Sequence, residues 1–153
     1  VKTGALIVIE QEEKLTDYIR TGINVDAILT SQLLINIFEH NTPLHDGAVI
    51  VRGNRVVAAT CYLPLSDNME LSKQLGTRHR AGVGISEATD SLTIIVSEET
   101  GQVSVARGGE LSRGLNSKQL REVLVSAQNK KVVDNGKLRN LLKGRVKHEE
   151  KSD

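Results

Sequence analysis

The strongest constraint on the fold is a set of short aliphatic runs, each bounded by polar residues or turn residues. Their length and their content of Val, Ile and Thr favour buried strands over helices. Gly53-Asn54 separates two of the runs as a two-residue hairpin turn, and Glu99-Thr100-Gly101 predicts a second turn. Strands joined by tight turns run antiparallel, so the sheet is not expected to be purely parallel. The predicted strands are Ala5–Ile9, Ala48–Val51, Arg55–Thr60, Leu92–Val96 and Gln102–Ala106.

Several segments between these strands have helical character. Thr30 or Ser31 can cap a helix over Gln32–Glu39. This helix has to end before Pro43, because the position before a proline disfavours helix. The other segments with helical spacing are Leu15–Ile19, Ser66–Leu75, Arg78–Ala88 and Ser117–Asn129.

Together these elements predict an α+β or α/β fold, a single globular domain with a central mixed β-sheet flanked by helices. The domain is expected to span residues 1–129. Residues 130–153 are polar and basic, and we expect a frayed helix or a disordered tail there. The chain begins with Val1 instead of Met and holds no run of roughly 20 apolar residues. We therefore interpret it as a fragment without a membrane span of its own.

Composition narrows the possible function classes. Aromatic residues make up 2% of the chain, which disfavours the base stacking that single-stranded nucleic acids require. The net charge of +1 gives no global attraction for polyanions. Cys61 is the one cysteine, so an internal disulfide and a zinc site built on several cysteines are excluded, and a reducing compartment is expected. The sequence also lacks the Walker A and GxGxxG phosphate-binding patterns.

The first polar cluster that can carry chemistry directly precedes the predicted strand Ala48–Val51. His45 and Asp46 can together hold a divalent ion, which would neutralise phosphate or activate a hydroxyl. Gly47 lets a backbone approach a ligand closely. The alternative is an ordinary loop in which Asp46 stabilises a turn, and spacing alone favours that alternative.

Two further clusters lie later in the chain. A predicted helix start carries Gly76-Thr77-Arg78-His79-Arg80. Arginine side chains bind phosphate bidentately. Thr77 can cap the helix while the exposed N–H groups of its first turn face an anion. The alternative is a solvated basic helix start. Ser97-Glu98-Glu99 follows a predicted strand, with Ser97 suited to a phosphate oxygen and a glutamate suited to a metal. The alternative there is an ordinary β-turn.

Taken together, the three clusters resemble the diadenylate cyclase (DAC) domain, whose hallmarks are a DGA motif and an RHR motif. Asp46-Gly47-Ala48 and Arg78-His79-Arg80 match these motifs in the same order. The resemblance extends through NTPLHDGAVIV, YLPLS, LGTRHRA and IVSEETG, covers roughly Thr3–Leu124, and is strongest to the membrane-anchored CdaA or DacA subfamily. Gly82 departs from the pattern, because an alanine is expected there. A glycine inside a helix costs about 0.5–1 kcal/mol relative to alanine, which would soften the helix without removing chemistry.

The resemblance implies that a symmetric dimer of such domains joins two ATP into cyclic di-AMP and releases two pyrophosphates. It implies that Asp46 positions Mn²⁺ or Mg²⁺, with His45 assisting, and activates the ribose 3′-hydroxyl. It places Thr77, Arg78 and His79 on the triphosphate. The other implied site residues are Gly47, Ala48, Tyr62, Leu63, Gly76, Ser97, Glu98 and Glu99 as substrate contacts, and Arg80 as their support.

The resemblance also implies a location at the cytoplasmic face of a bacterial membrane, a regulatory membrane partner, and phosphoglucosamine mutase as an inhibitor. No nucleic-acid partner is expected. Two alternatives stay open: a nucleotide sensor without turnover, and a nucleic-acid-binding module that uses the basic tail with Arg78 and Arg80. Product formation separates the first alternative from an enzyme, and a steep salt dependence of DNA affinity would favour the second.

Overall fold

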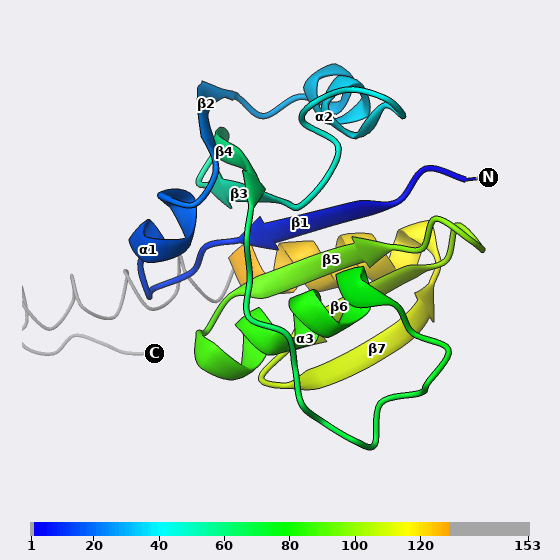
Figure 1. Ribbon diagram of the computed structural model, residues 1–153. Helices are drawn as coiled ribbons and strands as arrows, with labels where there is room; N and C mark the ends of the chain where they lie inside the picture. The colour runs from blue at the N-terminus through cyan, green and yellow to red at the C-terminus, as the bar shows by residue number, and fades with distance from the viewer. Residues whose placement is uncertain (1, 129–153) are drawn as a thin grey trace, which may run out of the picture. The chain divides into compact units, whose positions relative to one another are not determined.

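Seven strands of the computed structural model form one mixed sheet in the order β2-β4-β3-β1-β5-β6-β7 (Figure 1). The structure describes residues 2–128. β1 pairs in parallel with β3 and antiparallel with β5, and the remaining neighbours pair antiparallel, so the predicted mixed sheet is confirmed. The strands are β1 (Ala5–Ile9), β2 (Ile23–Ile28), β3 (Ala48–Arg52), β4 (Arg55–Cys61), β5 (Leu92–Val96), β6 (Val103–Arg107) and β7 (Glu110–Leu115). The helices of the same unit are α1 (Thr16–Ile19), α2 (Ser31–Phe38) and α3 (Thr77–Ala88).

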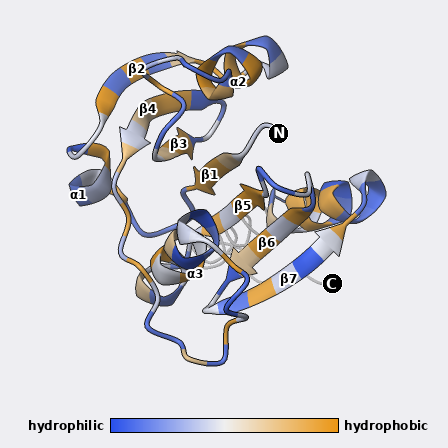
Figure 2. Cartoon of the chain, turned by 45° about the vertical axis from the view of Figure 1, so that its right-hand side comes forward, coloured by the Kyte–Doolittle hydropathy of each residue, from blue (hydrophilic) through white to orange (hydrophobic). Residues whose placement is uncertain are grey.

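The side chains of each strand alternate between the two faces of the sheet, and both faces are aliphatic. Helices cover both of them. Leu6 and Val8 of β1 face one core, which also contains Val83 and Ile85 of α3. The opposite face of the sheet packs against Ile37 and Phe38 of α2. The central strands are accordingly hydrophobic throughout, whereas β7 alternates with polar residues (Figure 2).

Most predicted elements are confirmed. Thr30 caps α2 as predicted, and its side chain accepts a hydrogen bond from the Leu33 N–H at 3.1 Å. Four places need correction. The polar segment Ser66–Leu75 is not helical and consists of turns and extended chain. Thr77 is the first residue of α3 and does not cap it, because Gly76 occupies the cap position. Two strands, β2 and β7, were not predicted from the sequence.

The chain divides into two compact units, Val1–Leu115 and Asn116–Asp153. In the second unit the described residues form a helix over 117–128, as predicted. The predicted basic tail of residues 130–153 lies outside the described residues. Within residues 2–128, no helix is both long enough and apolar enough to cross a bilayer.

Two glycines let α3 lie close to its neighbours. A Cβ atom on Gly82 would lie 2.8 Å from Cδ1 of Ile95 on β5, so the missing side chain makes room for this contact. A Cβ on Gly84 would overlap the backbone carbonyl oxygen of Pro64. The helix nevertheless runs unbroken from Thr77 to Ala88. Gly82, which departs from the expected alanine, therefore has a packing role against the sheet.

Glu10 ties the end of β1 to the β3–β4 hairpin. Its side chain is 2% exposed and accepts hydrogen bonds from Nε of Arg52 at 2.7 Å, Nη2 of Arg52 at 2.9 Å and the Leu15 N–H at 2.9 Å. Burial alone would raise the pKa of this carboxyl. The hydrogen bonds from Arg52 and Leu15 outweigh burial, so the pKa lies below its ordinary value of 4.5.

We expect Glu10→Gln to lower the free energy of unfolding at pH 7 by about 1–3 kcal/mol, because it removes a charge-assisted pair with Arg52. A carboxyl with a lowered folded-state pKa stabilises above its unfolded pKa and loses that contribution as pH falls. The loss in free energy of unfolding caused by Glu10→Gln should therefore stay constant from pH 6 to 8 and shrink below about pH 4.5. Urea unfolding of the variant and the unaltered chain at several pH values measures this loss.

Glu13→Gln, a substitution of an exposed residue, is the control and should cause no such loss. A loss for Glu10→Gln that persists in full at pH 3 would contradict the role assigned to the ionised carboxylate.

Candidate functional site

A cavity of about 930 Å³ opens where β3 begins, β4 ends, α3 begins and β5 turns into β6. Its volume falls within the range of small-molecule sites. The three polar clusters of the sequence converge on it from separate parts of the chain. The predicted site residues that line it are His45, Asp46, Gly47, Tyr62, Leu63, Gly76, Thr77, Arg78, His79, Ser97, Glu98 and Glu99.

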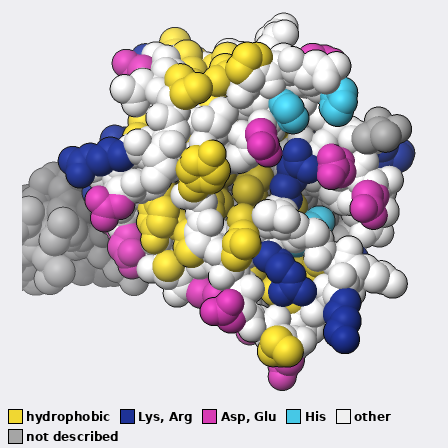
Figure 3. Space-filling model, viewed as in Figure 1, with side chains coloured by type: hydrophobic (Ala, Val, Ile, Leu, Met, Phe, Trp, Pro, Cys, Tyr) yellow, Lys and Arg dark blue, Asp and Glu magenta, His cyan; other side chains and the backbone are white. Residues whose placement is uncertain are grey.

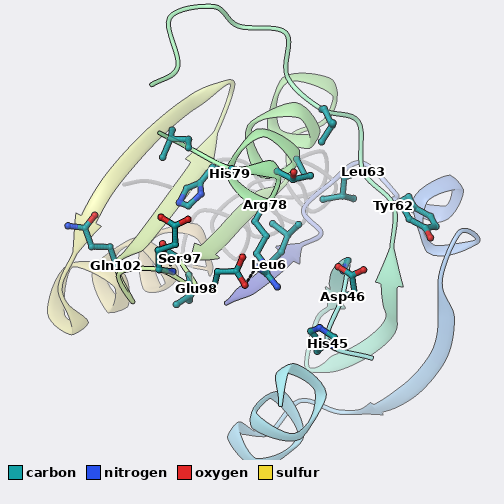
Figure 4. A pocket seen from close by; sticks show the side chains of 18 of the residues that line it. Leu6, His45, Asp46, Tyr62, Leu63, Arg78, His79, Ser97, Glu98 and Gln102 are labelled. Carbon is teal, nitrogen blue, oxygen red and sulfur yellow. Dashed lines mark hydrogen bonds and ion pairs between the residues drawn. The ribbon is translucent and has the colours of Figure 1, made fainter. Parts of the chain in front are cut away.

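One wall of the cavity carries His45 and Asp46 (Figure 4). Asp46 is exposed, and its Oδ1 accepts a hydrogen bond from the Gly47 N–H at 3.1 Å. Nδ1 of His45 lies 2.6 Å from the carbonyl oxygen of Thr42. A carbonyl can only accept, so Nδ1 carries a proton, and in the neutral imidazole Nε2 then keeps its lone pair. This arrangement fixes the imidazole in the tautomer that can act as a ligand or as a hydrogen-bond acceptor.

A strained bulge in β4 shapes the same wall. Two residues of β4, Ala59 and Thr60, lie opposite one residue of β3 between the Ala48–Cys61 and Ile50–Ala58 pairs. Thr60 has φ +53°, a left-handed conformation that costs a β-branched residue about 1–3 kcal/mol. Gly47 has φ +80°, and a Cβ there would lie 2.9 Å from Cα of Thr60. The close approach that Gly47 permits is therefore to the Thr60 backbone, and bulges of this kind commonly redirect side chains beside functional sites.

The opposite wall is the N-terminus of α3. Gly76 is its cap residue and no side chain caps the first turn, which leaves N–H groups there for another acceptor. Arg78 pairs with Glu98, its Nη1 lying 3.3 Å from Oε2 of the carboxylate. Burial, followed by the charges of Arg113 and Arg78, lowers the pKa of the His79 imidazole. His79 is therefore mainly neutral at pH 7, where two guanidinium groups act on it.

The turn after β5 closes the cavity on the side of Arg78. Oγ of Ser97 accepts hydrogen bonds from the N–H groups of Glu99 and Thr100, each at 3.2 Å. Its own hydroxyl proton stays available to a ligand. In Figure 4, Ser97, Glu98 and His79 lie on one side of the cavity, and Asp46, His45 and Tyr62 lie on the other.

Two predicted site residues do not line the cavity. Ala48 is fully buried in β3. Arg80 lies in α3 behind the lining residues, and its carbonyl oxygen accepts the Ser66 N–H at 2.9 Å, which holds the segment after Tyr62 against the helix.

The structure adds lining residues that the sequence analysis did not single out. Most of them flank the recognised motifs, so their proximity to those motifs was the available signal. Arg113 is different, because it lies on β7, a strand that was not predicted. Cys61 is buried, which raises the pKa of its thiol to about 11, so it is not a thiolate nucleophile. The added residues are Leu6, Pro43, Thr60, Cys61, Leu65, Gln74, Leu75, Ala81, Val96, Thr100, Gln102 and Arg113.

The protein donors for a metal are few. Among residues 2–128, no group of three or more His, Cys, Asp or Glu side chains is placed to hold an ion. His45, with Nε2 free, and Asp46 offer two donors on the same wall. Mg²⁺ typically takes only one or two carboxylates from a protein and fills its shell with water and phosphate oxygens. The donor set therefore fits a metal that arrives with a phosphate ligand.

The cavity joins an uncapped helix N-terminus and two arginines to a carboxylate–imidazole pair, an arrangement suited to an elongated anion with a reactive group at one end. Acidic and basic side chains are mixed over the face of the molecule in Figure 3, so this face presents no broad patch of one charge beside the charged groups of the cavity.

Fold and cavity thus define a mixed-sheet domain whose cavity is suited to a phosphorylated small molecule. The chain belongs to the DAC family, because the family model described as DisA bacterial checkpoint controller nucleotide-binding matches residues 1–111.

Individual relatives agree with this assignment. The chain is 62% identical over 123 residues to the cyclic di-AMP synthase CdaA of Bacillus subtilis, covering 80% of this chain and 45% of the relative. It is 57% identical over 124 residues to a diadenylate cyclase of Listeria monocytogenes, with 81% and 45% covered. The crystal structure of a DacA double mutant from Staphylococcus aureus matches with a TM-score of 0.80 and 53% identity, over 82% of this chain and 83% of that one. The chain spans about half the length of the curated relatives it matches.

Proposed function

We propose that this chain is the catalytic domain of a diadenylate cyclase, which condenses two ATP into cyclic di-AMP and two pyrophosphates. The observation that carries the proposal is the convergence of Asp46 and the N-terminus of α3, with Arg78 and His79, on one cavity. The names of the relatives support the same reaction.

In the proposed reaction, the 3′-hydroxyl of each ATP attacks the α-phosphorus of the other. A bond forms between O3′ and the α-phosphorus, the bond from that phosphorus to the bridging oxygen breaks, and pyrophosphate leaves with the electron pair. Such phosphoryl transfers depend mainly on positioning and on neutralising charge. The protein's contribution is therefore geometric and electrostatic, without a covalent intermediate.

The roles follow from position in the cavity. Asp46 orients the 3′-hydroxyl and accepts its proton. The N–H groups at Thr77, the guanidinium of Arg78 and the neutral imidazole of His79 donate hydrogen bonds to phosphate oxygens. To reach them, Arg78 exchanges its partner Glu98 for phosphate, and the carboxylate keeps the guanidinium positioned until then. The remaining proposed contacts are Tyr62 and Leu63 on adenine, and Gly47, Gly76, Ser97 and Glu99 along the ribose and phosphates.

Asp46 and Nε2 of His45 would hold Mn²⁺ or Mg²⁺, which when bound supplies positive charge beside the α-phosphate and lowers the pKa of the attacking hydroxyl. The Nδ1–H bond to Thr42 orients the imidazole for this purpose, as hydrogen bonds behind metal ligands commonly do. One relative in the structural comparison is described as a hypothetical membrane spanning protein from Bacillus cereus, which supports a place for this domain at a membrane surface.

The test is product formation. The purified chain is incubated with ATP and either Mn²⁺ or Mg²⁺, and nucleotides are separated by ion-pair chromatography with mass detection. A cyclic di-AMP peak that disappears when EDTA is added is expected. Saturable ATP binding without any product, at protein concentrations high enough for dimers and with both metals, would favour a nucleotide sensor.

Each domain offers one Asp46 and one α3 N-terminus, so reciprocal attack requires two domains face to face. We expect the cyclic di-AMP formed per chain per minute to fall as the protein is diluted below its dimer dissociation constant. Activity measured over a hundredfold range of protein concentration, beside sedimentation of the same samples, checks this. A specific activity that stays constant while the sedimenting species is a monomer would contradict the dimer requirement.

A further inference from the structure

Arg113 reaches the cavity from β7, and its charge acts on His79, as the charge of Arg78 does. Leu111 of the same strand packs into the core beside α3. Arg113 lies two positions further along, so the alternation of the strand directs it to the same face. The pairing of β6 with β7 shifts register between the Val105–Ser112 and Val103–Leu115 pairs. Gly114 has φ +70° at this irregularity, and the resulting bulge leaves Arg113 lining the cavity.

Arg113 forms no salt bridge with another described residue. Among the salt bridges between described residues, Arg78 pairs with Glu98 at 3.3 Å, whereas Arg113 takes part in none within 4.0 Å. Its charge acts on His79, because it is the second cause, after the burial of that imidazole, of the lowered pKa of His79. A guanidinium without a salt-bridge partner, in the same cavity as an uncapped helix N-terminus, is suited to bidentate binding of a phosphate.

The position of Arg113 selects which phosphate it can bind. Asp46 and Tyr62, the proposed contacts of ribose and adenine, lie across the cavity from His79 (Figure 4). A triphosphate that runs from the ribose toward His79 therefore places its terminal phosphates beside Arg113.

We infer that Arg113 binds the β- and γ-phosphates of ATP, the part of the substrate that leaves as pyrophosphate. This inference rests on the proposed function and deepens it, because it assigns the distal end of the triphosphate site to a residue outside the recognised motifs. Arg113 and Arg78 then both hold the leaving group, and neutral His79 donates a hydrogen bond to it.

The test compares two ligands that differ in the distal phosphates. α,β-Methylene-ATP carries all three phosphorus atoms, whereas cyclic di-AMP keeps adenine, ribose and the α-phosphate alone. Titration calorimetry with Mg²⁺ measures both affinities for the unaltered chain, Arg113→Ala, Arg113→Lys and the control Arg107→Ala. Arg107 is an exposed arginine at the end of β6 that does not line the cavity. Thermal unfolding confirms that each variant is folded.

We expect Arg113→Ala to weaken binding of α,β-methylene-ATP about tenfold or more, the usual loss for a hydrogen-bonded charged group. Binding of cyclic di-AMP should change less than about twofold. Arg113→Lys should recover part of the loss, and Arg107→Ala should change neither affinity. Equal weakening of both ligands, or an Arg113→Ala variant that matches Arg107→Ala, overturns the assignment while the proposed function stands. An unaltered chain that binds neither ligand overturns the function and this inference together.

Discussion

Asp46→Asn is expected to lower the rate of cyclic di-AMP formation at least about a hundredfold and to change ATP affinity only a few-fold. Asparagine keeps the size of the side chain, and its oxygen can still accept the Gly47 N–H bond that Asp46 makes at 3.1 Å. It cannot accept a proton from the 3′-hydroxyl, and it brings no charge to a metal. The local structure should therefore survive while the reacting group loses its base.

The measurement combines steady-state turnover with titration of α,β-methylene-ATP. Asp17→Asn is the matched control, because that side chain is 94% exposed on α1 and its ion pair with Arg20 is long, at 3.9 Å. The control should retain both turnover and affinity. If Asp46→Asn loses affinity in proportion to turnover, Asp46 is chiefly a binding residue, and if it loses neither, the proposed site is wrong.

The sequence was sufficient for the centre of the sheet because the physical signal there is strong. The runs at β1 and β5 are aliphatic, short and bounded by turns, and the Gly53-Asn54 turn fixes the β3–β4 hairpin. The candidate site was predicted from the resemblance to the DAC domain, because spacing alone did not separate its motifs from ordinary loops and turns. These motifs lie at the ends of the strands and of α3, where loops converge.

The edges of the sheet could not be predicted in this way. β2 and β7 are mostly exposed, so they lack the continuous apolar run of a buried strand. β2 alternates apolar and polar residues over 23–27, but this run is short and no tight turn joins it to a recognised strand. The pairing of β2 and β7 is decided by the neighbouring strands β4 and β6, which is tertiary information. Arg113 was missed as a consequence, because a residue on an unrecognised edge strand cannot be placed at a cavity.

The segment Ser66–Leu75 shows the opposite error. Its spacing favours a helix, but the Ser66 hydroxyl donates a hydrogen bond to Oε2 of Glu87 at 2.9 Å. The same oxygen of Ser66 accepts a hydrogen bond from the Asn68 N–H at 3.1 Å. Asn68 in turn accepts the Glu70 N–H through its side chain at 2.9 Å. Side-chain bonds of this kind compete with helical hydrogen bonds and stabilise successive turns.

Gly84→Ala is expected to lower the free energy of unfolding by about 3 kcal/mol or more, the upper range for an overpacked core. The added methyl group would overlap the Pro64 carbonyl oxygen and lie 2.7 Å from its carbon and 3.0 Å from the Ser66 nitrogen. These are backbone atoms, and the bond from the Ser66 N–H to the Arg80 carbonyl ties the segment to α3. Neither side can yield by rotating a side chain.

The other glycines of this region give a graded comparison for that result. At Gly82 the added methyl meets side-chain atoms of Ile95 and Thr93 instead of backbone, and the gain in helix propensity of about 1 kcal/mol offsets part of the strain. At Gly76 it meets nothing within 4 Å. Thermal unfolding should therefore show a fall on the order of 10 °C for Gly84→Ala, a small shift for Gly82→Ala and almost none for Gly76→Ala. Because Leu63 and Leu65 line the cavity on either side of Pro64, ATP affinity should fall with stability in Gly84→Ala. A Gly84→Ala variant that is as stable as Gly76→Ala and binds ATP normally would show that the helix and this segment are not in contact in solution.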